Sequence, residues 1–214
     1  MVRVRVVVCD VGLGNLRSVE RALREAGRGM PVDVEVTGDP AQVATADRLV
    51  LPGQGGFGDC ARALEGILGD AVREHVRKEK PYLGICLGFQ VLFASSEEAA
   101  GCLGLDVLAG EVVRLREGVD PATGGRLKIP HVGWNVVEPE AGHEGLLSEG
   151  PQHFSFMHSF VAVPRDASVV AGTTEYGSER FVSAVARGNL FACQFHPEKS
   201  QRAGIALLER FLGS

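Results

Sequence analysis

A cysteine stands between two glycines in the stretch GICLG at residues 84–88, at the point where a buried strand is expected to turn directly into a helix. Residues 82–86 predict the strand, which is entered from a proline, and the helix is expected to begin at Leu87 and to continue through residue 93. The flanking glycines remove side chains that would clash in so sharp a turn. The arrangement is typical of a nucleophile elbow, in which a strained backbone presents a reactive side chain.

Two interpretations of Cys86 follow from this stretch. At the start of a helix, the unpaired backbone N–H groups and the positive end of the helix dipole favour thiolate over thiol, as a nucleophile requires. Alternatively, Cys86 is a small buried side chain, since free cysteine is among the most buried residue types, and the glycines only allow close packing. Other parts of the chain must distinguish these two interpretations.

A histidine and a glutamate near the other end of the chain favour the chemical interpretation. The tripeptide HPE at residues 196–198 directly follows a predicted strand at residues 190–195. Residues two apart in an extended segment share a face, so His196 and Glu198 are expected to point the same way. Glu198 would then bond one ring nitrogen and fix the tautomer, leaving the other nitrogen for Cys86. General-base assistance of this kind is worth about 10²- to 10⁴-fold in rate.

A glycine-rich turn, LPGQGG at residues 51–56, follows the apolar strand predicted at residues 48–51. If this turn lies beside Cys86, the backbone N–H groups near Gly53 and Gln54, with that of Leu87, form an oxyanion hole. One such donor is typically worth about 10²- to 10³-fold in rate. The alternative is an ordinary flexible turn, since glycine-rich turns are common.

Cysteine, histidine and glutamate in this chain order, with PGxG after an earlier strand and GxCxGxQ at the elbow, resemble the class I glutamine amidotransferases. The resemblance implies that a cysteine attacks the side-chain amide of L-glutamine and releases glutamate and ammonia through a glutamyl thioester. Cys86 then matches the nucleophile, His196 the base and Glu198 the residue that orients it. No cofactor and no metal are implied. The positions that match glutamine contacts are Gly53, Gln90, His158, Ser159 and Phe160.

Three further stretches, residues 10–19, 128–135 and 194–200, narrow the resemblance within that class. They look like the glutaminase subunits that serve histidine biosynthesis. The resemblance implies a heterodimer in which the chain docks on the mouth of a (β/α)₈-barrel cyclase and delivers ammonia through the barrel. Other class I subunits, serving aromatic, pyrimidine or guanine synthesis, are the runner-up, and residues 128–135 tell against them. The candidate partner-contact or coupling residues are Asn15, Lys128, Trp134 and Lys199.

Lysine usage supports two of these candidates. The chain contains 18 arginines and four lysines, and two of the four, Lys128 and Lys199, lie inside the motifs. We expect Lys199 at the subunit interface, where a compact ammonium is not replaceable by a planar guanidinium. The alternative for Lys199 is a solvated lysine at a strand end. Trp134 is expected either to anchor the interface, because aromatic residues are enriched in binding hot spots, or to lie in the core.

Three positions depart from the usual pattern of the class. Val11 stands where an aromatic residue is frequent, Gln54 where valine is common, and Phe160 where tyrosine is usual. None removes a catalytic group. Gln54 matters most, because its peptide is the expected oxyanion donor and partner docking is expected to reorient that peptide.

Composition excludes several classes of function. The net charge of −5 and the lack of a basic stripe outside residues 73–80 argue against a nucleic-acid surface. The longest apolar runs are strand-sized, so neither a membrane span nor a signal segment is expected. Five cysteines, without paired metal spacing, fit a reducing cytoplasm best. His75 is predicted on a solvated helix face and His143 in a polar loop.

Alternating strand and helix patterns in the first half of the chain predict a parallel sheet with right-handed crossovers. Strands are expected at residues 2–9, 32–36, 48–51 and 82–86, with helices at 15–26, 59–68 and 70–79. After residue 102 the pattern changes to strands joined by short turns, at 111–116, 126–129, 134–137, 153–157, 168–173, 181–186 and 190–195, with a hairpin turn at 120–125 and a closing helix at 204–212. We therefore predict a single α/β domain over residues 1–214, with a central mixed, largely parallel sheet flanked by helices.

Two rival functions come from other classes. Gly12 and Gly14 resemble the start of a dinucleotide fingerprint, with Glu35 near the expected ribose position, but Arg17 occupies the third glycine position. A partial fingerprint of this kind is weak, and residues 12–15 are better explained as a loop near the site or the partner. The other rival is a non-enzymatic redox sensor or chaperone that uses Cys86 alone. Such a protein needs no HPE tripeptide, so residues 196–198 tell against it.

Overall fold

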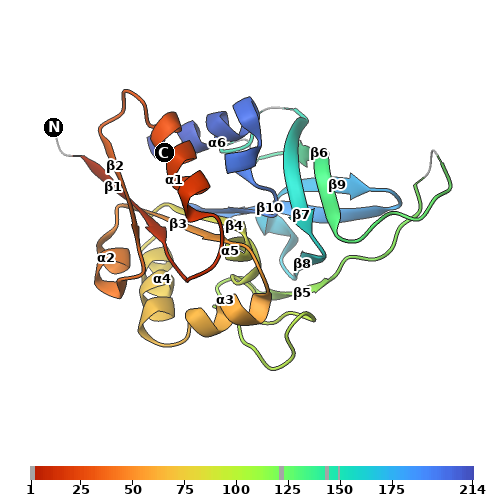
Figure 1. The fold of residues 1–214 in the computed structure, drawn as a ribbon, viewed down its shortest axis with the longest axis horizontal. Coiled ribbons are helices and arrows are strands. Elements are labelled where there is room, and N and C mark those ends of the chain that lie inside the picture. Colours follow the sequence, from red (N-terminus) through yellow and green to blue (C-terminus); the bar gives the residue numbers. More distant parts are fainter. Residues whose placement is uncertain (1–2, 121–122, 143–144, 149) are drawn as a thin grey trace.

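The computed structural model describes residues 3–120, 123–142, 145–148 and 150–214. Its strands form one mixed sheet with helices packed on both faces (Figure 1). Along the main path of the sheet the strand order is β2-β1-β3-β4-β11-β10-β9-β6-β7, and β8 joins β10 to β5 off this path. Strands from opposite ends of the sequence, β4 and β11, are therefore neighbours in the middle of the sheet.

One half of the sheet is parallel. It consists of β2-β1-β3-β4-β11, and each neighbouring pair in this run is parallel. The predicted strands of the first half of the chain are confirmed here with small changes at their ends. The bounds are β1 Val4–Cys9, β2 Val32–Thr37, β3 Arg48–Gly53, β4 Tyr82–Cys86 and β11 Leu190–Cys193.

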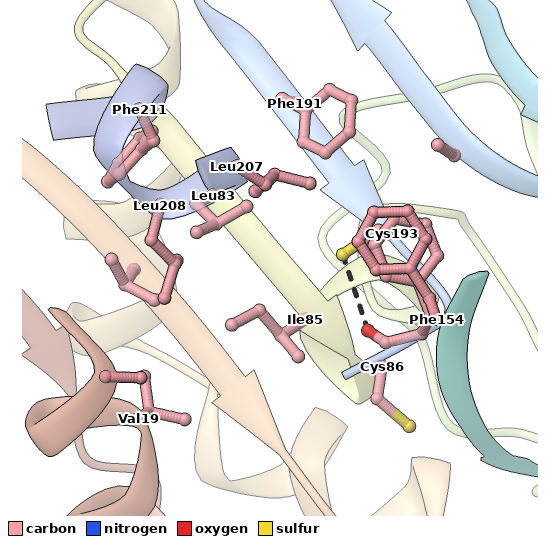
Figure 2. Close-up of a cluster of buried hydrophobic side chains, with 14 of the residues drawn as sticks. Val19, Leu83, Ile85, Cys86, Phe154, Phe191, Cys193, Leu207, Leu208 and Phe211 are labelled. Carbon is pink, nitrogen blue, oxygen red and sulfur yellow. Dashed lines mark hydrogen bonds between the residues drawn. The ribbon is translucent and has the colours of Figure 1, made fainter. Parts of the chain in front are cut away.

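Helices cover both faces of this parallel half, as its apolar strands require. α1 and α6 pack on one face, where Val6 and Val8 of β1 point, while α2, α3 and α4 cover the other face, where Val7 points. Figure 2 shows α6 side chains against Leu83 and Ile85 of β4. The bounds are α1 Leu16–Ala26, α2 Pro40–Thr45, α3 Phe57–Ala63, α4 Ile67–Arg77 and α6 Gln201–Gly213.

The other half of the sheet is antiparallel, so largely parallel pairing holds only from β2 to β11. The mixed sheet itself is confirmed. Sequence analysis missed β8 and the short α2. The bounds are β5 Gly110–Arg114, β6 His131–Pro139, β7 Gln152–His158, β8 Phe160–Pro164, β9 Val170–Tyr176 and β10 Glu179–Arg187.

The strand predicted at residues 126–129 is wrong. Arg126 forms only an isolated bridge with Val119, and the backbone groups of the next two residues bond outside any strand. The Leu127 N–H donates to the Gly118 carbonyl (3.0 Å), and the Tyr176 hydroxyl donates to the Lys128 carbonyl (2.8 Å). The turn predicted at 120–125 closes with a hydrogen bond from the Asp120 N–H to the Gly125 carbonyl, although residues 121–122 lie outside the described residues.

Two other local predictions are corrected. The helix after the elbow, α5 Leu87–Gln90, is one turn long and does not extend through residue 93. His75 is fully buried, because its Nε2 bonds the Pro81 carbonyl (3.0 Å) where the end of α4 meets the sheet. Burial lowers the pKa of His75 from its usual value, against the raising effect of that bond. His143 lies outside the described residues.

The longest helix of the described residues, α6, has 13 residues. Within the described part of the chain, no helix combines the length and the apolar character needed to cross a membrane.

Candidate active site

The strained strand-to-helix turn predicted at residues 84–88 is present. Cys86 ends β4 and precedes α5 with φ +55° and ψ −104°, a conformation that costs an L-residue about 1–3 kcal/mol. A Cβ on Gly88 would lie 1.7 Å from the Leu51 carbonyl oxygen, and one on Gly84 would lie 2.5 Å from the Gly88 oxygen. Only glycine fits either position. Figure 2 shows Cys86 beyond Ile85, where β4 ends.

The glycine-rich turn lies beside this elbow. β3 ends at Gly53, which pairs with Cys86 in the parallel register, and a Cβ on Gly53 would lie 2.7 Å from the Leu87 Cβ. The backbone of Gly53 thus lies next to Cys86 and Leu87, and Gln54 follows it directly in the chain. A Cβ on Gly14 would lie 3.2 Å from the Gln54 nitrogen, so Gly14 packs against this turn, in agreement with the loop expected near the site.

His196 and Glu198 meet as the sequence predicts. β11 runs parallel to β4, and the chain leaves it through His196 into a short 3₁₀ turn, η2 Pro197–Lys199. His196 Nδ1 lies 2.9 Å from Glu198 Oε1, and both side chains are 2% exposed. The bond to the carboxylate fixes the proton on Nδ1 and leaves Nε2 buried without a hydrogen bond of normal geometry.

The electrostatics of His196 link it to Cys86. Burial alone would lower the pKa of His196, but the side chains of Cys86 and Glu198 favour the imidazolium more strongly, and together they raise that pKa to about 9. A protonated imidazole beside a cysteine stabilises the thiolate in return. His196 is therefore an imidazolium at neutral pH, and the Cys86 side chain is one of the two groups that favour this charge.

Three of the residues that match glutamine contacts, Gln90, His158 and Phe160, are joined by hydrogen bonds. Gln90 is buried, and its Nε2 donates to the Phe160 carbonyl (3.2 Å) and to Gln194 Oε1 (2.9 Å). His158 Nδ1 bonds the same Phe160 carbonyl (3.0 Å). Ser159 lies between β7 and β8, half-buried, and its carbonyl accepts from the Leu115 N–H.

A second histidine continues this network. His131 Nδ1 lies 3.0 Å from His158 Nε2, and Asn135 Nδ2 lies 3.3 Å from His131 Nε2. Burial lowers the pKa of His131 to about 4, and burial with the neighbouring His131 lowers that of His158 to about 3. Both rings are therefore neutral at neutral pH.

The candidate partner residues lie on exposed surface. Trp134 is 51% exposed on β6, which excludes the core alternative. Lys128 and Lys199 are exposed, and Asn15 caps α1 by accepting from the Ser18 N–H (3.3 Å).

Gln194 is a site residue that sequence reasoning passed over. It is fully buried, and its Nε2 lies 3.6 Å from Cys86 Sγ. No signal in the sequence could have assigned it this place, because only the register of the neighbouring strands β4 and β11 brings Gln194 next to Cys86.

Within the described ranges, no group of three or more histidine, cysteine, aspartate or glutamate side chains is placed to hold a metal ion. Cys9, Cys60, Cys86, Cys102 and Cys193 are all free thiols.

Comparisons with known proteins agree with this geometry. The family model described as glutamine amidotransferase class-I matches residues 7–213. Two solved structures share the fold. The structure of PurLQS from Thermotoga maritima has a TM-score of 0.75 at 19% identity, covering 99% of both chains. A second, described as a glutamine amidotransferase, has a TM-score of 0.71 at 22% identity, covering 98% of this chain and 99% of that one.

The chain therefore belongs to the class I glutamine amidotransferases. Within this class it is similar to proteins named imidazole glycerol phosphate synthase subunit HisH. The relative from Aquifex aeolicus is 48% identical, covering 97% of this chain and 95% of the relative. The relative from Syntrophotalea carbinolica is 45% identical, covering 96% and 98%.

Proposed function

We propose that this chain is the glutaminase subunit of an imidazole glycerol phosphate synthase and that it hydrolyses L-glutamine to glutamate and ammonia. The observation that carries the proposal is the buried His196–Glu198 pair, 2.9 Å apart, electrostatically linked to a cysteine in a strained elbow. The similarity to HisH subunits over nearly the whole chain supports the choice of pathway.

The proposed reaction begins with attack of Cys86 Sγ on the side-chain carbonyl carbon of glutamine. The carbonyl oxygen becomes an oxyanion, which the backbone N–H groups near Gln54 and Leu87 stabilise. When the C–N bond breaks, His196 gives its proton to the leaving nitrogen, so that ammonia departs and a glutamyl thioester remains on Cys86. Glu198 holds the imidazole in position throughout.

The second half of the reaction frees the enzyme. His196, now neutral, takes a proton from water, and the resulting hydroxide attacks the thioester carbonyl carbon. Glutamate leaves as the C–S bond breaks, and the Cys86 thiolate and the His196 imidazolium are restored. Gly53, Gln90 and the segment His158, Ser159 and Phe160 are proposed to hold the glutamine during both steps.

Ammonia chemistry argues for a partner. Free ammonia in neutral water is mostly protonated and no longer nucleophilic, so a glutaminase acting alone would waste its product. We propose that a (β/α)₈-barrel cyclase subunit forms a heterodimer with this chain and receives the ammonia. It would convert the nucleotide PRFAR to imidazole glycerol phosphate and AICAR. The reducing cytoplasm, where thiols persist, is the proposed location.

An exposed apolar face on the β6–β7 pair is the proposed docking surface. Val132 and Trp134 are two residues apart on β6 and point to the same side, and Met157 of β7 is the cross-strand partner of Val132. Their exposed fractions are 64%, 51% and 42%. Monomeric proteins rarely expose large contiguous apolar patches unless the patch has a function. Asn15, Lys128 and Lys199 are proposed to contact the partner around this face.

The same strand pair offers a route from partner to site. Ser155 is the cross-strand partner of Trp134, and its carbonyl accepts the His196 N–H (2.9 Å). A partner that contacts Trp134 would therefore be connected to the backbone of His196 through a single residue, Ser155. We also propose that docking reorients the Gly53–Gln54 peptide toward the oxyanion, a population shift of a local element.

The test is glutamate release from L-glutamine by the purified chain, alone and with the barrel cyclase and its nucleotide ligand. We expect weak activity alone, strong stimulation in the complex, and loss of both in Cys86→Ala. Activity that depends on Cys86 but is not stimulated would keep the glutaminase and reject the pathway. Activity that survives in Cys86→Ala would reject the mechanism, and no activity under any condition would favour a cysteine sensor.

A further inference from the structure

Gln194 places a buried amide between two residues of the candidate site. It directly follows β11, whose parallel register with β4 pairs Cys193 with Ile85 and so brings Gln194 level with Cys86. The side chain is fully buried, and both ends of its amide are used: Oε1 accepts from Gln90 (2.9 Å), and Nε2 contacts Cys86 Sγ (3.6 Å). Gln194 makes and breaks no bond in the proposed reaction.

The direction of these hydrogen bonds is fixed by a carbonyl group. The Phe160 carbonyl can only accept, so the Gln90 atom 3.2 Å from it must be the NH₂ group. The same NH₂ group faces Gln194, which must therefore present its oxygen to Gln90. The remaining end of the Gln194 amide, an N–H donor, is left for the Cys86 sulfur.

The histidines on the far side of Phe160 agree with this direction. His158 Nδ1 also faces the carbonyl and must carry a proton, so the neutral ring accepts at Nε2 from His131 Nδ1–H. His131 then accepts at Nε2 from Asn135, whose oxygen is occupied by the Val136 N–H. Donors on both sides thus converge on the Phe160 carbonyl, and every assignment is consistent.

We propose that Gln194 is a positioning residue that donates an N–H to Cys86 Sγ and stabilises the thiolate in the resting site. A thiolate accepts hydrogen bonds more strongly than a thiol, because a charged acceptor roughly doubles the strength of the bond. Gln194 also holds the Gln90 amide in place through its oxygen. The inference rests on the proposed role of Cys86 as the nucleophile.

Other titratable groups around Cys86 do not replace this donor. Cys60 of α3 and Cys193 of β11 act on Cys86 electrostatically, but burial raises the pKa of Cys60 to about 12 and that of Cys193 well above its usual value, so both stay neutral thiols. The positive charge near Cys86 comes from His196, and the carboxylate of Glu198 lies on the other side of the His196 ring. Gln194 is the neutral donor whose direction the network fixes.

The test measures alkylation of the full chain by iodoacetamide from pH 5 to 10, with the modified cysteines resolved by peptide mass spectrometry. Alkylation reports thiolate at Cys86 whether or not glutamine is the substrate, so failure of this inference is distinct from failure of the glutaminase assay. Cys102, half-buried and 3.7 Å from Arg62, is an internal reference in the same molecule. Gln152→Met makes the same exchange on β7 as a matched control.

In Gln194→Met, which keeps length but removes the donor, we expect Cys86 alkylation at pH 7 to slow about tenfold and its half-maximal pH to rise by about one unit. Gln194→Glu, which presents a carboxylate, should slow it further. Cys102 and the Gln152→Met control should not change. An unshifted Cys86 profile in Gln194→Met overturns the proposal. Faster alkylation of both cysteines with a lower unfolding midpoint also overturns it, because that is the result of a merely structural role.

Discussion

Cys86 ends β4 and His196 follows its parallel neighbour β11, yet the two sides of the site are held in place by different forces. On the Cys86 side, Gly53, Gly84 and Gly88 let three segments approach so closely that no Cβ fits. On the His196 side, buried polar groups such as Glu198 and Gln194 fix the geometry through hydrogen bonds. The first side is expected to be sensitive to volume, and the second to the identity of donors and acceptors.

The largest expected effect tests the volume-sensitive side. In Gly88→Ala the new methyl group would meet the Leu51 carbonyl oxygen at 1.7 Å, and neither backbone segment is free to move. We expect the free energy of unfolding to fall by about 4 kcal/mol, measured by chemical denaturation. Gly145→Ala is the control, since a Cβ there meets nothing within 4 Å and should change stability little. A loss below about 1 kcal/mol in Gly88→Ala would show that the elbow can relax.

The next effect tests the polar side. Glu198→Gln keeps the volume but removes a charge that favours the His196 imidazolium, so we expect glutaminase activity to fall about 10²- to 10³-fold with little loss of fold. Because the pKa of His196 is raised to about 9, wild-type activity should decline as the pH rises through 9. In the variant this decline should move to lower pH. A pH profile that keeps its basic limb would contradict the pairing.

The raised pKa of His196 also makes the free energy of unfolding depend on pH. A histidine whose folded pKa exceeds its usual 6.5 stabilises the fold fully below pH 6.5, and this contribution is lost as the pH rises toward 9. The difference in unfolding free energy between wild type and Glu198→Gln should therefore be larger at pH 6 than at pH 9.5. Equal differences at the two pH values would argue against a charged His196 in the folded chain.

The smallest effect tests whether the antiparallel side also serves docking. Trp134→Ala removes an exposed aromatic side chain from the β6–β7 face, and we expect the dissociation constant for the barrel cyclase to rise about 30-fold, or about 2 kcal/mol. Ile67→Ala on α4 is the control, because Ile67 is 75% exposed but lies on a helix away from the β6–β7 face. Titration calorimetry of both variants provides the comparison. Equal affinities for the two variants would remove Trp134 from the interface.

The parallel half was predictable because its signals are local. Mostly apolar residues make up β1, β3 and β4, which are largely buried, and strands buried on both faces show as continuous apolar stretches. The elbow was predictable for the same reason, since its glycines and Cys86 are adjacent in the sequence. The HPE tripeptide likewise carries both members of the His196–Glu198 pair within three residues.

The remaining features depend on contacts between distant residues. The pattern of residues 126–129 predicts a strand, but Arg126 forms only an isolated bridge, and the Leu127 N–H donates to the Gly118 carbonyl outside any strand. His75 belongs to a charged sequence, yet its ring is buried against the Pro81 carbonyl. Gln194 becomes a neighbour of Cys86 only through the register of β4 and β11. Periodicity and composition do not contain this information.

The positive φ of Cys86 has a consequence for laboratory evolution. Glycine adopts this backbone conformation without the steric cost that every other residue bears there. A screen that selects variants for heat resistance alone would therefore favour Cys86→Gly. The variant it enriches would be more stable to heat but would lack the nucleophile. Thermostabilisation of this chain should therefore keep Cys86 and score turnover together with melting temperature, because the backbone strain at Cys86 lowers stability while the thiol is needed for activity.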